Sequence, residues 1–407
     1  MWNFSTELSV PLGLKDASKK GLQQLLDRKD LGFFNLELME QSIEQSLQLA
    51  EQFKDKPNFW IVGLGGSSLG SKALATALLS SNNSKKFYFL DNVDSEYVEQ
   101  NLSSISSLDE HLFVFISKSG STLEVLSLLD HCNQYFKEKG QDLTKHMVII
   151  TESKESPMRQ FAKKFDIATL SVPAEVGGRF SVFTPVGLFP AACMGIDISQ
   201  FKKGFQNVLE EDHIITELAS LLLNSLSQQE FDFYLFQYSD RLFNFGLWFQ
   251  QLWSESLGKA RNNEGEVAPT ISTFIPLRGS SDQHSVLQQI AEGQKKKLVG
   301  FVRVEASEKS TLQLNHPIPG NELMKSKGLG DLLAAAAIAT QQSLSEMGHS
   351  TFCLKTDQID PQTMGYLMGL SMLVVGTLGE VMRLNAFDQP GVESGKRITR
   401  RVLQNSH

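Results

Sequence analysis

Cysteine is scarce in this chain. Its 407 residues include three cysteines, Cys132, Cys193 and Cys353. They are far apart, and none has the CxxC or His/Cys spacing of a zinc site. We therefore expect no disulfide framework and no structural metal, and we interpret the three as buried thiols in a reducing compartment.

The chain also lacks an excess of basic charge. It has 38 Lys and Arg against 46 Asp and Glu, a formal net charge of -8 and a pI of about 5.6. This balance argues against nucleic acid as the main partner, since proteins that bind nucleic acid carry basic surfaces. A local basic pocket for a small anion remains compatible with it.

Long apolar runs are rare as well. The N-terminus lacks the basic segment and apolar core of a signal peptide. Residues 361–379 carry no charge and are only marginally long enough to span a bilayer, but they include Gln, Ser, Thr and several Gly. We predict a buried helix there, and a soluble cytoplasmic protein without membrane contact.

Most of the remaining sequence alternates between short apolar runs and helical periodicity. Residues 15–52 and 190–230 show helical spacing. Strands are predicted in "NFWIVGL", "KFYFLDN", "HLFVFI", "HMVIITES", "IATLSVP", "FDFYLFQYSD", "KLVGFVRVE" and "STFCLKTD". Strands that alternate with helices predict an α/β fold with mostly parallel sheets covered by helices on both faces.

Four segments follow from this alternation. We assign residues 1–50 to N-terminal helices, 51–195 to a first α/β domain and 196–385 to a second, while 386–407 form a terminal helix.

A glycine loop, "GLGGSSLGSK" at residues 63–72, follows the first predicted strand. Gly63 and Gly65 fit the dinucleotide fingerprint GxGxxG, but Ser68 stands at its third glycine. Gly65 and Gly70 fit the spacing of a nucleotide P-loop, but the serine and lysine that should follow are reversed. Neither template matches, and a simple tight turn of small residues remains an alternative.

A serine loop, "SKSGST" at residues 117–122, precedes another predicted helix. Ser117, Ser119, Ser121 and Thr122 surround Gly120. Hydroxyls and the free N–H groups of a helix N-terminus suit a tetrahedral anion such as a monophosphate. Serine clusters are also often only helix caps, so this alternative stays open.

Four later residues could move protons or hold charge. Arg179 follows a pair of glycines and could stabilise an oxyanion, Glu255 beside apolar neighbours could be a general base, and His284 could exchange a proton near neutral pH. Taken singly, each is more often a surface or capping residue. With Lys396 they make a complete set for proton transfer on a sugar.

Six sequence blocks resemble the phosphoglucose isomerase family in its short bacterial form. They are "VGLGGSSLG", "FISKSGSTLE", "VGGRFSVFTPVGL", "ESLGK", "DQHSVLQ" and "FDQPGVESGK", in the family's order from residue 62 to 396. The resemblance implies two sugar-isomerase (SIS) domains, each a doubly wound, mostly parallel sheet. It also implies aldose–ketose isomerisation between glucose 6-phosphate and fructose 6-phosphate, without a metal or other cofactor.

The resemblance also implies residue roles. Glu255 matches the catalytic base, Arg179 the arginine that stabilises the enediolate, and His284 and Lys396 the pair linked with ring opening. The matches to substrate-binding residues are Gly66, Ser67, Ser117, Lys118, Ser119, Ser121, Thr122 and Gln251. A homodimer is implied too, with His284 reaching the neighbouring chain's site.

Three positions depart from the common family pattern. Gly120 stands where many members have an aromatic residue, Val125 where they have Thr, and Leu257 where Asn is common. These departures leave substrate preference open. An isomerase for mannose 6-phosphate or an amino-sugar phosphate, and a sugar-phosphate sensor without catalysis, are the alternatives.

Overall fold

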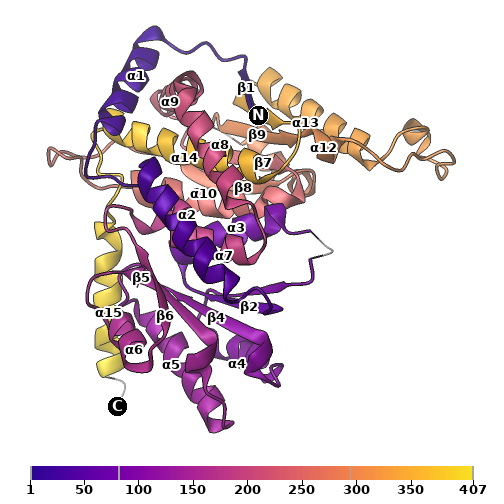
Figure 1. Ribbon diagram of the computed structural model, residues 1–407. Coiled ribbons are helices and arrows are strands. Elements are labelled where there is room, and N and C mark those ends of the chain that lie inside the picture. The colour runs from indigo at the N-terminus through magenta and orange to yellow at the C-terminus, as the bar shows by residue number, and fades with distance from the viewer. Residues whose placement is uncertain (1, 81–82, 294, 406–407) are drawn as a thin grey trace.

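The computed structural model describes residues 2–80, 83–293 and 295–405. It contains two five-stranded sheets, one in each half of the molecule (Figure 1). This confirms the predicted α/β class and every strand named above.

The first sheet is entirely parallel, with strand order β3-β2-β4-β5-β6. Its strands are β2 (Asn58–Val62), β3 (Lys86–Leu90), β4 (His111–Ile116), β5 (Met147–Glu152) and β6 (Ala168–Val172). The core on one face includes α4 (Ser95–Ser103), α5 (Leu123–Glu138) and α6 (Pro157–Phe165). The core on the other includes α2 (Leu36–Glu51) and α7 (Pro185–Cys193), so helices cover both faces as predicted.

The second sheet has the order β1-β10-β9-β7-β8, and only β1 is antiparallel. Its strands are β1 (Asn3–Thr6), β7 (Asp232–Tyr238), β8 (Thr273–Arg278), β9 (Leu298–Val304) and β10 (Ser350–Thr356). The core on one face includes α11 (Leu287–Glu292) and α13 (Leu329–Glu346). The larger core on the other includes α1 (Leu12–Leu26), α8 (Ile198–Glu210), α9 (Asp212–Ser227), α10 (Phe243–Leu257) and α14 (Pro361–Val381).

The two sheets share one connection pattern. Numbered along the chain, the strands of each domain lie in the order 2-1-3-4, as β3-β2-β4-β5 and as β8-β7-β9-β10. In such sheets the order in which strands are added reverses between the first and third strands, and ligands bind at the carboxyl ends of those strands.

Two strands were missing from the sequence prediction. The first 50 residues contain the expected helices α1 and α2 but also β1, which pairs with β10. Strand β8 contains Pro276, which weakens a strand pattern but is tolerated because β8 lies at an edge of its sheet.

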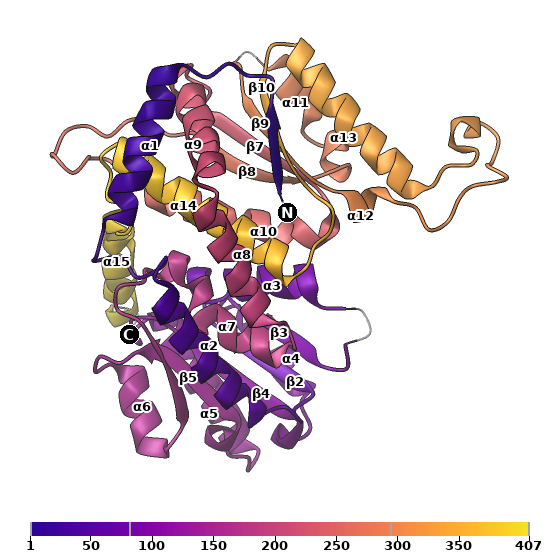
Figure 2. The ribbon, with the colours of Figure 1, turned by 45° about the horizontal axis from the view of Figure 1, so that its top comes forward.

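The uncharged stretch forms α14, as predicted. Within the described ranges it is the one helix long and apolar enough to cross a membrane, and 89% of its most apolar window is buried inside the protein. Figure 2 shows α14 running between α9 and α10.

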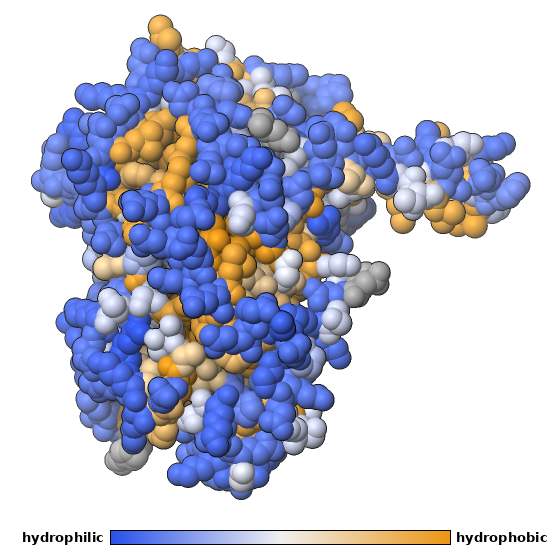
Figure 3. Space-filling model, viewed as in Figure 1, coloured by the Kyte–Doolittle hydropathy of each residue, from blue (hydrophilic) through white to orange (hydrophobic). Residues whose placement is uncertain are grey.

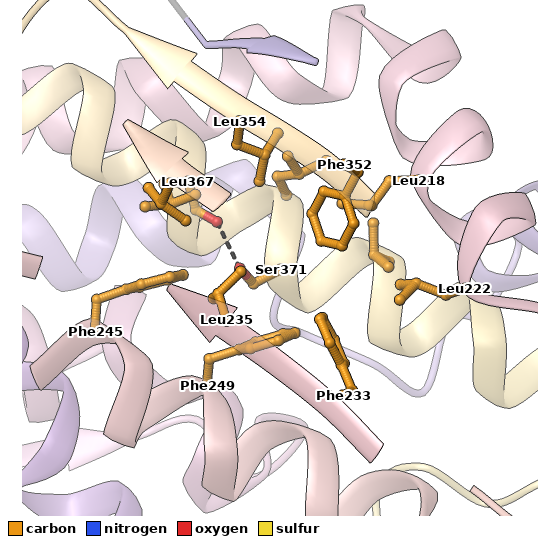
Figure 4. A pocket seen from close by; sticks show the side chains of 13 residues that line it. Leu218, Leu222, Phe233, Leu235, Phe245, Phe249, Phe352, Leu354, Leu367 and Ser371 are labelled. Carbon is orange, nitrogen blue, oxygen red and sulfur yellow. Dashed lines mark hydrogen bonds between the residues drawn. The ribbon is translucent and has the colours of Figure 1, made fainter. Parts of the chain in front are cut away.

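A small cavity of about 30 Å³ lies within the core of the second domain (Figure 4). Its lining is apolar except for Ser371, whose hydroxyl donates to the Leu367 carbonyl of its own helix at 2.8 Å. Since its one polar group is satisfied, this cavity belongs to the core and presents no ligand chemistry.

The remaining elements are short or lie outside the sheets. They are α3 (Leu69–Leu78), α12 (Glu305–Glu308), α15 (Glu393–Gln404) and the 3₁₀ helices η1 (Gly65–Ser67), η2 (Leu108–Glu110), η3 (Leu143–His146), η4 (Gly178–Phe183), η5 (Asp240–Leu242), η6 (Ser281–His284), η7 (Glu322–Met324) and η8 (Pro390–Val392).

Candidate active site

The glycine loop and the serine loop lie at the topological switch point of the first sheet, between β2 and β4. The glycine loop follows β2 and the serine loop follows β4, which are neighbouring parallel strands. Both loops therefore meet at the carboxyl edge of the sheet, where a ligand is expected.

The glycine loop is packed against two other segments. Gly65 has a φ of +55°, and a Cβ atom on it would lie 2.7 Å from Nε2 of Gln251 on α10. A Cβ atom on Gly66 would lie 2.4 Å from the carbonyl oxygen of Gly178. The two glycines thus let the loop, with half-buried Ser67, approach both η4 and α10 closely.

The serine loop gathers hydroxyl groups at the N-terminus of α5. The hydroxyls of Ser117 and Thr122 are 2.8 Å apart, and Ser121 Oγ donates to Ser119 Oγ at 3.1 Å. Gly120 makes the turn with a φ of +62°, and a Cβ atom there would lie 2.2 Å from Ser156 Oγ. Thr122 is the N-cap residue, but its side chain does not cap the helix, so backbone N–H groups of the first turn stay available to an anion.

Lys118 is the one cation of the serine loop. Its ammonium group lies 3.0 Å from Glu152 and donates to the carbonyl of Ala174 at 3.1 Å. Much of its charge is therefore compensated by the protein, and the groups that remain in the loop are neutral donors.

Arg179 is buried and is held in place by neighbours from two other segments. Only 4% of it is exposed. Its guanidinium donates to Ser256 Oγ at 2.7 Å, to Gln389 Oε1 at 3.0 Å and to the carbonyls of Ala386 and Asp388. This arrangement leaves it little freedom to reorient.

Glu255 lies near the end of α10, beside this arginine. Its Oε2 is 3.6 Å from Nη1 of Arg179, and its Oε1 accepts a hydrogen bond of 3.2 Å from Nε2 of Gln251. The side chain is 32% exposed. The carboxylate is thus held from one side and open to a ligand on the other.

Gln251 also presents an unused acceptor. Its Oε1 is buried and has no hydrogen-bond partner within the described ranges. A buried amide oxygen without a partner is costly, and a hydroxyl group of a bound ligand would satisfy it.

Four residues that surround Arg179 and Glu255 were not predicted from the sequence. They are Ser256, Lys259, Asp388 and Gln389. All four lie in blocks quoted above, and Lys259 stands four residues after Glu255. The four-residue spacing could have placed Lys259 near Glu255. No local pattern links Asp388 to Arg179 and Lys259, which are more than a hundred positions earlier.

Burial lowers the pKa of two of these cations, Arg179 and Lys259. Desolvation lowers the pKa of Arg179, and the negative charges of nearby Glu255 and Asp388 partly oppose this shift. Desolvation also lowers the pKa of Lys259, whose ammonium donates to the carbonyls of Glu255 and Asp388 and lies 3.0 Å from the Asp388 carboxylate. An arginine remains protonated even so, so Arg179 is a permanent buried cation.

His284 does not join this group within one chain. It ends η6 and is exposed, beyond the carboxyl end of β8. Glu255 lies at the other end of the same strand. Trp253, two residues before it on α10, donates a hydrogen bond to the carbonyl of Ser272, which directly precedes β8. The six residues of β8 put roughly 20 Å between the two ends.

Lys396 approaches the serine loop from α15. Its ammonium is paired with Glu393 at 2.8 Å. A cavity of about 410 Å³ separates this helix from the loop, and its lining includes Ser119, Ser121, Thr122 and Lys396. Figures 1 and 2 show α15 alongside the first domain.

The comparison with protein families decides the relationship. The model of the family described as phosphoglucose isomerase matches residues 40–407. This chain belongs to the phosphoglucose isomerase family. The match includes both loops, Arg179, Glu255, His284 and Lys396.

Relatives of the phosphoglucose isomerase family resemble the chain over most of its length. It is 36% identical to a glucose-6-phosphate isomerase of Thermus thermophilus, over 85% of this chain and 83% of the relative. It is 33% identical to one of Campylobacter jejuni, over 92% of each chain.

Solved structures show the same fold. A hypothetical protein of Thermus thermophilus superposes with a TM-score of 0.90 and 32% identity, over 99% of this chain and all of that one. A glucose-6-phosphate isomerase of Chlamydia trachomatis gives a TM-score of 0.81 at 20% identity, over 99% of this chain and 88% of that one. The latter likeness concerns the fold alone.

Proposed function

We propose that this chain interconverts glucose 6-phosphate and fructose 6-phosphate, a step of glycolysis and gluconeogenesis, as an intramolecular oxidoreductase. The observation that carries the proposal is the Glu255 carboxylate, held beside the buried Arg179 and bonded to Gln251, which packs against the glycine loop. A base next to a fixed cation is what enolisation beside a carbonyl requires.

Each group has one part in the proposed reaction. His284, with Lys396, protonates the ring oxygen and opens the sugar. Glu255 then removes the proton from C2 and returns it to C1 on the same face. The intermediate is a cis-enediol or its enediolate, and Arg179 stabilises the negative charge on the enediolate oxygen without a metal.

The remaining side chains bind and orient the sugar. Gly66 and Ser67 line the phosphate end, and Ser117, Ser119, Ser121 and Thr122 hold the phosphate itself. Lys118 contributes the part of its charge that Glu152 leaves uncompensated. Gln251 accepts a hydrogen bond from a sugar hydroxyl through its unused oxygen. Binding energy from the distant phosphate helps to position the reacting carbons.

Substrate comparison tests the reaction and its alternatives. Purified protein with chelator should convert fructose 6-phosphate to glucose 6-phosphate faster than it converts mannose 6-phosphate or an amino-sugar 6-phosphate. Preference for one of the latter would support another sugar-phosphate isomerase. Tight binding of fructose 6-phosphate without turnover would support a sensor, although a sensor has no use for the Glu255–Arg179 pair.

Removing hydroxyls from the serine loop should weaken binding more than chemistry. We expect the double variant Ser119→Ala, Thr122→Ala to raise KM for fructose 6-phosphate by about tenfold or more, since a hydrogen bond to a charged group contributes about 1.5–3 kcal/mol. Steady-state kinetics would measure this, with Ser103→Ala, an exposed serine on α4, as control. A loss confined to kcat would refute the role of the loop.

We further propose that the enzyme is a homodimer in which His284 of one copy completes the site of the other. In one chain His284 lies at the opposite end of β8 from Glu255. Residues 309–328 also project as an arm with exposed Leu312, Ile318 and Leu323 (Figures 1 and 3). Such exposed apolar residues are typical of surfaces that contact another chain.

Mixing two inactive variants tests this arrangement. Glu255→Gln and His284→Ala should each be nearly inactive alone. A mixed dimer would hold one site with both native residues, so co-refolded or co-expressed chains should regain activity. Each mixed dimer should reach up to about half of the activity of a native dimer, since one of its two sites is intact. No recovery, with mixed dimers demonstrated by differential tags, would mean that each site is built from one chain.

We also place the enzyme in the cytoplasm, without membrane or nucleic-acid partners. The segments 51–195 and 196–385 are proposed as its two SIS domains, with residues 1–50 and 386–407 packed against them.

A further inference from the structure

Among its described residues, the serine loop has no free cation to balance the negative charge of a bound phosphate group. A sugar phosphate brings a dianion at neutral pH. The hydroxyls and N–H groups of the loop are neutral, and Lys118 is already engaged by Glu152 and Ala174. A cation from another segment would add a charge-assisted hydrogen bond, which is stronger than a neutral one.

Helix α15 supplies the facing wall of the cavity. Besides residues of the serine loop, Leu123 and Glu124, the cavity is lined by Glu393, Gly395, Lys396, Thr399 and Arg400. Lys396 and Arg400 are four residues apart and therefore lie on the same face of the helix. Both cations face the serine loop across the cavity.

The two cations differ in their partners. Lys396 is paired with Glu393 at 2.8 Å. Within the described part of the chain, Arg400 makes no side-chain hydrogen bond or ion pair, although its charge, after that of Lys396, helps to lower the pKa of Glu393. Arg400 is thus the cation of this cavity whose donors remain available.

The balance of charge in the cavity also depends on this residue. Glu124 and Glu393 oppose Lys396 and Arg400 there. Without Arg400 the lining would carry a net negative charge and would repel a phosphate group.

We propose that Arg400 binds the phosphate group of the substrate, across the cavity from Ser119 and Ser121, and so favours phosphorylated sugars. This rests on the proposed function of the serine loop as the phosphate site. A planar guanidinium suits this task because it can donate two parallel hydrogen bonds to phosphate oxygens. Arg400 is a binding residue in this account, and the proton transfers are left to Glu255 and its partners.

Matched substitutions on the same helix test the proposal. Arg400→Gln should raise both KM for fructose 6-phosphate and the inhibition constant of inorganic phosphate by about tenfold, as expected for one charge-assisted hydrogen bond, and change kcat by less than about twofold. Arg400→Lys should recover part of the loss. Arg401→Gln is the control, because Arg401 is exposed and does not line the cavity.

The outcomes separate this proposal from the proposed function. If Arg400→Gln and Arg401→Gln give the same KM and the same inhibition by phosphate, the role of Arg400 is wrong while the isomerase remains. If the native protein does not convert fructose 6-phosphate, the proposed function fails. Calorimetric titration of both variants with inorganic phosphate would then still decide whether Arg400 binds that anion.

Discussion

Replacing Glu255 by glutamine should lower kcat by about 10²- to 10⁴-fold, the range that a positioned general base contributes. The amide is almost the same size, and it can still accept the hydrogen bond from Gln251. It cannot remove a proton from carbon. We therefore expect the dissociation constant of fructose 6-phosphate, measured by calorimetry, to change only a few-fold.

Glu264→Gln is the matched control for this prediction. Glu264 is an exposed carboxylate paired with Arg383 at 2.7 Å, away from the two loops. This variant should keep native kcat. Near-native turnover in Glu255→Gln would show that another group is the base.

Replacing Arg179 by lysine should lower kcat by about 10²- to 10³-fold, the effect of losing a fixed oxyanion donor. The charge is kept, but an ammonium cannot reproduce the fork that reaches Ser256, Gln389 and two carbonyls. The buried acceptors left without a partner should also lower the free energy of unfolding, by about 1–3 kcal/mol each. Kinetics and urea unfolding on the same preparation would measure both effects.

Arg241→Lys separates catalysis from stability. Arg241 is exposed, but its guanidinium also donates to backbone carbonyls, those of Ala77 and Ile359. Its replacement should lower the stability while leaving kcat of the folded protein unchanged. Equal loss of kcat in the two variants would reduce the role of Arg179 to holding the fold.

The fold was largely predictable because its strands are buried on both faces. Strands such as β4 and β5 read as short apolar runs that stand out from the surrounding helices. The two missed strands lie at the edges of the second sheet, where residues are only partly buried and Pro276 is tolerated. Local sequence carries little signal for such strands.

The candidate site could be proposed from the sequence where one short block holds its chemistry. The serine loop, Arg179 and Glu255 each stand in a recognisable local pattern. Two partners that hold Arg179 could not be foreseen, because Asp388 and Gln389 are separated from it by 209 and 210 residues along the chain. The position of His284, at the far end of β8, likewise depends on the direction of a strand that the sequence did not reveal.

Exchange with solvent deuterium is the most direct test of the central claim, which is proton transfer by Glu255 through an enediol. Fructose 6-phosphate would be incubated with the protein in D₂O, with chelator present, and followed by proton NMR over many turnovers. We predict glucose 6-phosphate that carries deuterium at C2, with both its formation and its labelling lost in Glu255→Gln. Glucose 6-phosphate formed with no deuterium at C2 after prolonged turnover, or no product at all, would contradict the account.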